Sequence, residues 1–340
     1  MPELSQPGAW LPLVFLLLMG VAMMVYVILD GFDLGVGILL RRADDEEKDM
    51  MVASIGPFWD ANETWLVLGV GILLVAFPMA HGVILGHLYF PVALMLAGLI
   101  LRGVAFDFRV KARAAHKQAW NTAFYAGSVL AAGAQGVMIG LYIVGFDTGT
   151  PQLAFAMFTG VSLLAGYALL GATWLIMKTE GGLQRKAIGW ARGSLLLCAL
   201  GIAAVSVVTP LVSQQVFDKW FALPNILLLA PVPVMTAALF VVADAVLRRM
   251  LAAPPADVEP LCWLPFAATV GIFLLAFNGL AYSVFPYLVV DRITIWQAAS
   301  APESLKIILW GVALVLPTII GYTVFSYRVF RGKARALSYS

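Results

Sequence analysis

The sequence predicts an all-α protein that crosses a membrane nine times. Of its 340 residues, 62% are hydrophobic and only 12% are charged, and its mean hydropathy is +0.93. Soluble domains carry about a quarter charged residues and fewer apolar ones, so a soluble enzyme, a nucleic-acid-binding protein and a disordered chain are all excluded. Two further observations support the prediction: long apolar runs recur along the chain, and the basic residues gather in alternate loops.

The apolar runs are long enough to be membrane-spanning helices. A helix needs about 20 residues to cross roughly 30 Å of hydrocarbon. Nine runs meet this length between polar breaks, at 11–40, 58–78, 86–108, 121–145, 153–177, 188–212, 224–247, 261–287 and 305–329. The break between the second and third runs depends on Pro78 and Gly82, and losing one span there would invert the topology downstream.

The basic residues predict the sidedness of these spans. Seventeen of the 21 Lys and Arg residues lie in or beside the loops that follow odd-numbered spans, and three lie on the opposite side. Because cytoplasmic loops are enriched in Lys and Arg, we expect the N-terminus outside and the C-terminus in the cytoplasm. Residues 1–9 hold no basic residue, so we expect no cleavable signal peptide.

The segments between the spans are short, so we expect no separate extramembrane domain. Residues 41–48 predict a solvated surface helix with acidic residues in its first turn. Glycines four residues apart indicate close helix contacts at Gly31 and Gly35, Gly82 and Gly86, and Gly136 and Gly140. Cys198 and Cys262 lie in apolar runs without a CxxC spacing, which predicts small buried residues.

Ionisable residues inside the first three spans are the main functional candidates. A charge inside the membrane costs at least a few kcal/mol, so such residues are rare unless they have a function. The first two spans each carry two acids three residues apart, and the third carries one cation and one acid: Asp30, Asp33, Asp60, Glu63, Arg102 and Asp107. They could form a proton conduit, or Arg102 could neutralise one acid while the others cap helices or reach the interface. Asp244 and Asp291 lie near span ends, so we expect their side chains at the membrane interface.

The histidines do not predict a metal or haem site. His81 and His87 flank an outer turn, and His116 lies in a cytoplasmic loop. A buried b-type haem needs axial ligands within the spans, and copper or zinc needs clustered ligands. We therefore expect no catalytic, cofactor-binding or metal-ligating residue in this chain, and we expect any redox centres to lie in another subunit.

Three strings in the first third of the chain resemble subunit II of the cytochrome bd quinol oxidases. They are DGFDLGVG at 30–37, SIGPFWDANETWL at 54–66 and RGVAFDFR at 102–109. The second string matches the GPFWD-x-NE-x-W pattern of that family, with Ala61 where many members carry Gly. The remaining two thirds of the chain agree with the family only in length, topology and apolar character.

The resemblance implies the second subunit of a bacterial terminal oxidase in the cytoplasmic (inner) membrane. In this family subunit I holds two b-type haems, one d-type or variant b-type haem, and the loop that oxidises quinol. Subunit II contains no haem and stabilises subunit I in its active form. The family architecture implies two four-helix bundles at 1–145 and 188–340, separated by a peripheral fifth helix and a loop at 146–187. Small single-span subunits, membrane lipids or a structural quinone are further expected partners, and nucleic acid is not.

The resemblance also implies roles for individual residues. Asp33, Asp60 and Arg102 match polar residues of a cytoplasmic proton path toward the haems. Trp65 matches a tryptophan at the mouth of an apolar oxygen route, although composition alone favours helix packing or an interfacial anchor for Trp59 and Trp65. The other members of the same strings, with roles assigned less directly, are Asp30, Asn62, Glu63 and Asp107.

Two other functions remain open from the residues alone. A proton-coupled transporter would be expected to show inverted repeats with interrupted helices in both halves. The acids instead crowd the first third, and the second half, 188–329, holds only Asn278 at mid-span. This asymmetry favours the oxidase subunit over a transporter, and a purely structural subunit without a proton role remains the third alternative.

Overall fold

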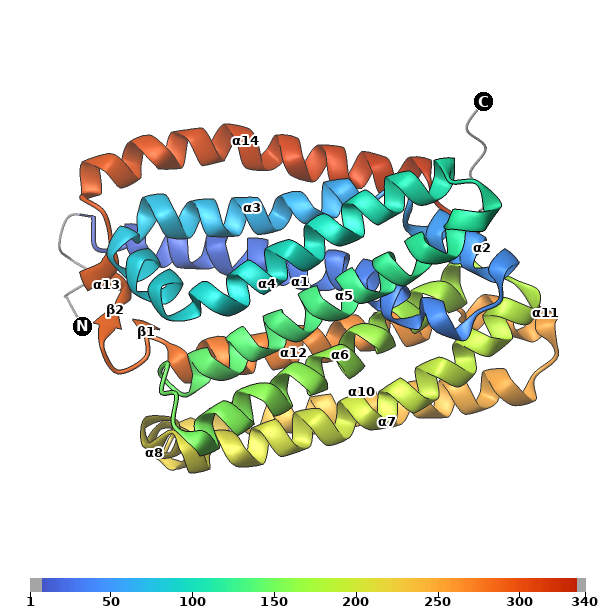
Figure 1. Ribbon diagram of the computed structural model, residues 1–340. Helices are drawn as coiled ribbons and strands as arrows, with labels where there is room; N and C mark the ends of the chain where they lie inside the picture. Colours follow the sequence, from blue (N-terminus) through green and yellow to red (C-terminus); the bar gives the residue numbers. More distant parts are fainter. Residues whose placement is uncertain (1–7, 335–340) are drawn as a thin grey trace.

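The computed structural model describes residues 8–334, and most of this range is helical (Figure 1). Within it, nine helices are long and apolar enough to cross a membrane, which confirms the predicted number of spans. These helices are α1 (Leu11–Leu39), α3 (Trp59–Ala76), α4 (Pro78–Lys111), α5 (Ala114–Ile143), α6 (Thr150–Lys178), α7 (Gly181–Val212), α10 (Pro231–Ala252), α12 (Leu264–Val284) and α14 (Pro302–Val329).

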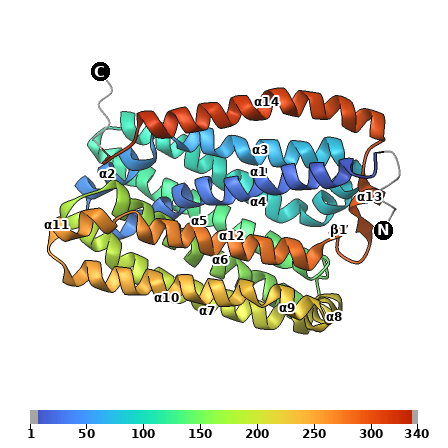
Figure 2. The same ribbon diagram turned by 180° about the vertical axis from the view of Figure 1, so that it is seen from behind.

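The shorter elements lie at the two ends of the bundle of long helices (Figures 1 and 2). One end holds η1 (Leu40–Arg42), α2 (Asp45–Ile55), α11 (Pro255–Val258) and η2 (Glu259–Leu261), and we call it the α2 end. The opposite end, the β1 end, holds α8 (Gln214–Phe221), α9 (Asn225–Leu229), β1 (Tyr287–Val289), β2 (Ile293–Thr294) and α13 (Ile295–Ala298). The loops rich in basic residues all lie at the α2 end.

Several of the long helices begin earlier than predicted, and α4 and α7 show two different reasons. Pro78 is the first residue of α4 and only Phe77 separates it from α3, so residues 78–85 are helical instead of forming a turn. Proline is favoured at the first position of a helix because it has no N–H to leave unpaired. Similarly, α7 begins at Gly181, a residue with φ of +64° that reverses the chain directly after α6.

The predicted surface helix exists, but only its start is solvated. Asp44 caps α2 in a capping box with Glu47, and the acidic residues of the first turn lie as predicted. Residues 51–55 at the other end of α2 are buried in the main apolar core. This burial was not predicted. At the β1 end, the chain between α12 and α14 forms the antiparallel pair β1–β2 and the short helix α13, which were also not predicted.

The fifth span packs against several other helices in the described residues, and the expected division into two four-helix bundles stays a prediction. Helix α6 contacts α1, α5, α7 and α12, and half of its most apolar window is buried (50%), against 0% for α14. Helices α1, α3, α4 and α5 pack as one group and α6, α7, α10 and α12 as a second, whereas α14 lies along the outside (Figures 1 and 2).

The central position of α6 depends on close contact between its backbone and that of α1. A Cβ atom on Gly35 would lie 1.8 Å from the carbonyl oxygen of Tyr167, and one on Gly171 would lie 2.3 Å from the carbonyl carbon of Gly35. Only glycine allows this approach. Gly136 and Gly140 make a similar contact between α5 and α6, as predicted.

The predicted glycine contact at Gly82 and Gly86 and the predicted burial of the cysteines had different outcomes. A Cβ atom on Gly82 or Gly86 would meet nothing within 4 Å, so the predicted helix contact at this pair is wrong within the described part of the chain. Cys198 is buried, Cys262 is half-buried, and both are free thiols.

Candidate functional site

Helices α1, α3 and α4 bring a buried cation between two carboxylates. Nη1 of Arg102 donates to Oδ1 of Asp30 at 2.6 Å, and Nη2 donates to Oε1 of Glu63. The side chains of Arg102 and Asp30 are 1% and 0% exposed, while that of Glu63 is 28% exposed. Burying such charges is costly unless they are paired, so this ion pair network defines how α1, α3 and α4 face one another.

The second carboxylate of α1 has a different environment. Oδ2 of Asp33 accepts a hydrogen bond from Nδ2 of Asn62 at 2.8 Å, and Asp33 is fully buried. The side-chain oxygen Oδ1 of Asn62 accepts a hydrogen bond of 3.1 Å from the hydroxyl of Tyr327 on α14. Asp33 is therefore held by a neutral amide, whereas Asp30 is held directly by a cation.

The cluster contains buried polar atoms with spare hydrogen-bonding capacity. In residues 8–334, Oδ2 of Asp30, Oδ1 of Asp33 and Nε of Arg102 have no partner. A buried polar atom left unpaired costs about 1–3 kcal/mol, so such atoms are uncommon in purely structural ion pairs. Each carboxylate of α1 therefore has one oxygen that no described residue donates to.

Asp60 and Asp107 do not join the cluster. Both side chains are exposed, and neither forms an ion pair with another described residue. Asp60 lies in the first turn of α3, close to the α2 end, where a negative charge is favourable. Of the six ionisable residues predicted for the site, the structure brings four together and leaves these two at the surface.

The two tryptophans of the second string occupy different environments. Trp65 is 3% exposed, belongs to a small cluster with Ala22 and Tyr26, and borders Leu316 and Ile319 of α14. Trp59 packs against Phe106 with ring centroids 5.0 Å apart, and the Arg102 guanidinium lies 5.9 Å from its ring centroid. The packing explanation therefore applies to Trp59, which covers the Arg102 side chain.

A chain of neutral polar side chains extends the site into the middle of the molecule. The hydroxyl of Tyr167 donates to Oε1 of Gln135 at 2.7 Å, and Nε2 of Gln135 donates to the hydroxyl oxygen of Tyr26 at 2.7 Å. Tyr26 lies one turn before Asp30 on α1. Sequence reasoning missed these residues, although a glutamine and tyrosines within apolar runs are a signal, because buried polar groups need partners.

A second polar cluster lies at the α2 end. Asp49 of α2 accepts hydrogen bonds from Nη2 of Arg109 at 2.7 Å and from Nζ of Lys117 at 2.6 Å. Nε of the buried Arg109 also donates to Oδ1 of Asn121 at 2.5 Å. Partial burial opposes the ionisation of Asp49, but the hydrogen bonds from Lys117 and Arg109 outweigh it and lower the pKa of this carboxyl below 3.8. From the sequence, Arg109 and Lys117 were predicted only as basic residues of a cytoplasmic loop.

The three histidines of the described residues lie apart from one another. His81 and His87 lie near the start of α4 at the β1 end, and His116 lies near the start of α5 at the α2 end. Among the described residues, no three His, Cys, Asp or Glu side chains come together in a group that could hold a metal ion.

Comparison with known proteins identifies the family. The family model described as cytochrome bd terminal oxidase subunit II matches residues 11–330. The cytochrome bd ubiquinol oxidase subunit 2 of Bacillus subtilis is 28% identical, with 95% of each chain covered. The cytochrome bd-I ubiquinol oxidase subunit 2 of Escherichia coli is 27% identical, with 92% of each chain covered.

The fold also matches a solved structure. A chain of the bd oxidase from Geobacillus thermodenitrificans superposes with a TM-score of 0.75 at 16% identity, covering 94% of this chain and 98% of that one. Nine membrane-spanning helices, the strings around Asp33 and Asp60, and the family match over residues 11–330 lead to one conclusion. The chain belongs to the cytochrome bd terminal oxidase subunit II family.

Proposed function

We propose that this chain is the haem-free subunit of a quinol oxidase and carries protons from the cytoplasm toward the haems of subunit I. Oxidation of two quinols releases four electrons and four protons, and reduction of one O2 to two waters consumes four of each. If the protons for water come from the cytoplasm, the complex needs a protein path for them. The carrying observation is the buried Arg102 cluster, which joins ionisable groups from three helices.

The exposure of the carboxylates supports a path that begins at the α2 end. Asp60 is exposed near that end, Glu63 one turn further into α3 is partly exposed, and Asp30 and Asp33 are fully buried. Arg102 contacts both Glu63 and Asp30, and its positive charge stabilises a negative charge on either carboxylate. Protons would enter at Asp60 and pass inward along these groups.

We assign the two carboxylates of α1 different roles in this path. Asp30 is paired with Arg102, and protonating it would leave the guanidinium with one carboxylate fewer in a low-dielectric interior. Asp33 is bound by the neutral amide of Asn62 and can take or lose a proton without breaking an ion pair. Asp33 is therefore the proposed proton carrier, and Asp30 with Arg102 sets the local field. Asp107, exposed on α4, is proposed as an outer member of the path.

The remaining roles follow the family. Trp65 borders an apolar region between α1, α3 and α14, which supports a proposed oxygen route there. The exposed apolar faces of α4 and α14 support a protein or lipid partner, with subunit I as the main one. Because the three histidines lie apart, we propose that the two b-type haems and the d-type or variant haem are all held by subunit I. With the basic loops at the α2 end, we propose that this end faces the cytoplasm of the bacterial inner membrane.

The substitution Asp60→Asn tests the proton path in the assembled complex. Asp60 makes no ion pair within residues 8–334, so removing its charge leaves the buried cluster intact. We expect at least tenfold slower quinol-dependent oxygen consumption with normal haem absorbance. Asp257→Asn is the matched control, since Asp257 is another exposed acid at the α2 end and its removal should leave the rate unchanged.

Three outcomes separate the alternatives. Slow turnover with full haem content supports the path. Loss of haem would mean that the carboxylate supports assembly, as in a purely structural subunit. Full activity with full haem content would exclude Asp60 from the path. A transporter of another solute is disfavoured because no cluster like that of Arg102 occurs among the described residues of α7, α10 and α12.

A further inference from the structure

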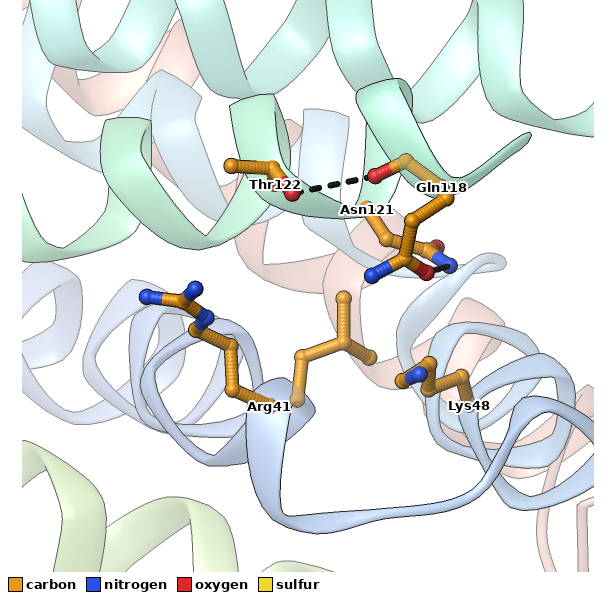
Figure 3. Close-up of a pocket in the computed structure, with 6 residues that line it drawn as sticks. Arg41, Lys48, Gln118, Asn121 and Thr122 are labelled. Carbon is orange, nitrogen blue, oxygen red and sulfur yellow. Dashed lines mark hydrogen bonds between the residues drawn. The ribbon is translucent and has the colours of Figure 1, made fainter. Parts of the chain in front are cut away.

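A small polar pocket opens at the α2 end between η1, α2 and α5 (Figure 3). Its volume is about 60 Å³, and it is lined by Leu40, Arg41, Lys48, Gln118, Asn121 and Thr122. One ordered water needs roughly 10–15 Å³ of such space, so the pocket can hold a group of several heavy atoms. None of its lining residues belongs to the Arg102 cluster.

Arg41 is the charged group of this pocket that is free to bind a ligand. Its side chain is exposed, and its guanidinium lies 5.0 Å from the ring centroid of Tyr125, a contact that orients it without neutralising it. In residues 8–334 no carboxylate lies within ion-pair distance of Arg41. Lys48 differs, because Asp45 accepts a hydrogen bond from its Nζ at 2.8 Å and fixes its position.

The opposite wall of the pocket presents neutral donors. Oε1 of Gln118 accepts a hydrogen bond from Nδ2 of Asn121 at 3.4 Å, which leaves Nε2 of Gln118 directed toward the pocket (Figure 3). No carboxylate is among the residues that line the pocket. Two cations and an amide N–H around one space favour an anion with several acceptor oxygens, and a phosphate group has this chemistry.

The level of the pocket favours a phosphate attached to a lipid. The first span ends at η1, and the fourth begins close to Gln118, so the pocket lies where two spans leave the apolar layer. Tyr125 contacts Arg41 of the pocket, and the half-buried Trp120 stacks on Phe108 near the start of α5. Aromatic residues of this kind mark the headgroup region. Basic pockets between spans at this depth bind anionic headgroups.

We propose that this pocket binds the phosphodiester of an anionic phospholipid, with Arg41 and Gln118 contacting the phosphate oxygens. Lys48 adds positive charge from the other side, and the acyl chains extend into the bilayer. Free phosphate shares the same chemistry but lacks the membrane that concentrates a lipid headgroup at this depth, so the lipid is the favoured source.

Lipid retention by the assembled complex tests the proposal. The variant is Arg41→Gln, and Arg42→Gln is the matched control, because Arg42 is adjacent, exposed and equally charged but does not line the pocket. Each complex is delipidated and exchanged with vesicles of phosphatidylcholine containing one fifth phosphatidylglycerol, and bound phosphatidylglycerol is counted by native mass spectrometry. We expect Arg41→Gln to lower retention at least fivefold and Arg42→Gln to lower it less than twofold.

Further measurements keep the result decisive. If Arg41→Gln does not assemble, Gln118→Leu removes the neutral donor from an exposed position and should lower retention at least threefold. Equal losses for Arg41→Gln and Arg42→Gln would overturn the site in favour of a general attraction to the basic surface. If inorganic phosphate raised the unfolding temperature of the wild type as much as the vesicles do, and Arg41→Gln abolished this effect, a free phosphate would be the ligand and the lipid assignment would be wrong.

Discussion

Two ion-pair networks in this chain are opposite in composition and in environment. In the first group of helices, Arg102 lies between two acids, Asp30 and Glu63, and is 1% exposed. In the second group, Asp244 lies between two cations, with Arg248 at 2.7 Å and Arg192 at 3.6 Å, and its side chain is 32% exposed. Both networks are intramembrane or near-interface clusters of three charges.

The difference shows that burial, and not the presence of charge, marks the candidate site. Arg248 and Arg192 are 67% and 40% exposed, so solvent or lipid headgroups screen their attraction to Asp244. Nothing comparable screens Arg102 or Asp30. Asp244 therefore fits its predicted interfacial role, whereas the Arg102 cluster has a desolvation cost that a structural role alone does not require.

The largest expected effect comes from removing the buried cation. Arg102→Leu leaves Asp30 and Glu63 without their partner, and breaking a buried ion pair from one side costs about 3–5 kcal/mol. The matched change Arg248→Leu should cost less than about 1 kcal/mol, because the pair is exposed. Thermal unfolding of the purified complex measures both. Equal losses would remove the distinction between the two networks, and partial recovery when Asp30→Asn is added would sharpen it.

A second prediction concerns the spacing of helices in the two regions. Gly35→Ala places a methyl group 1.8 Å from the backbone oxygen of Tyr167, and because backbone must shift we expect a loss of about 1–3 kcal/mol or more. Gly189→Ala on α7 meets nothing within 4 Å, so its effect should be neutral or slightly stabilising. The unfolding midpoints of the two variants give the comparison, and a harmless Gly35→Ala would contradict the contact between α1 and α6.

A smaller effect is expected where α14 meets the buried cluster. Tyr327→Phe removes the hydroxyl that donates to Asn62, which should cost about 1 kcal/mol and leave Asn62 free to reorient away from Asp33. Tyr322→Phe is the control on the same helix, because Tyr322 is 61% exposed. The unfolding temperature and the rate of oxygen consumption should both fall more for Tyr327→Phe than for Tyr322→Phe. Identical behaviour of the two variants would mean that the hydroxyl of Tyr327 does not position Asn62.

The smallest expected effect is the pH dependence of the Asp49 ion pairs at the α2 end. The folded state lowers the pKa of Asp49, so its contribution is complete above the unfolded value near 4 and is lost as the pH falls through the lower folded value. Since the side chain is 48% exposed, we expect less than about 1 kcal/mol. Asp49→Asn should reduce the change of the unfolding temperature with pH between about pH 5 and 3. An unchanged pH profile in the variant would exclude Asp49 as its source.

Sequence reasoning predicted the features that depend on composition along one helix. The number of spans, the acidic start of α2 and the pairs of acids in α1 and α3 all follow from local patterns. The position of α6 could not be predicted in this way, because it depends on how Gly35 and Gly171 meet between helices far apart in the chain. The helix starts at Pro78 and Gly181 were missed because α4 and α7 each begin several residues before the apolar run that predicts the span.

The candidate site was predictable in its residue types but not in its pairing. Asp30, Asp33, Glu63 and Arg102 could be proposed from charge inside apolar runs. Which acid contacts Arg102 depends on the rotation of α1, α3 and α4 about their axes, so Asp107, only five residues away, was an equally reasonable partner. The contribution of Tyr327 required a contact between residues 265 positions apart.

The attachment of α14 has a consequence for the order in which the chain is completed during synthesis. Ribosomes make proteins from the N-terminus, so α14 leaves the ribosome after the other eight spans. Tyr327 then closes over Asn62, and Nζ of Lys178 binds the carbonyl oxygens of Phe330 and Gly332 at 2.8 and 3.1 Å. The buried carboxylate of Asp33 thus acquires its full set of neighbours only after the ninth span has inserted. The hydrogen-bonded arrangement of Asp33, Asn62 and Tyr327 therefore forms late in the folding of the chain.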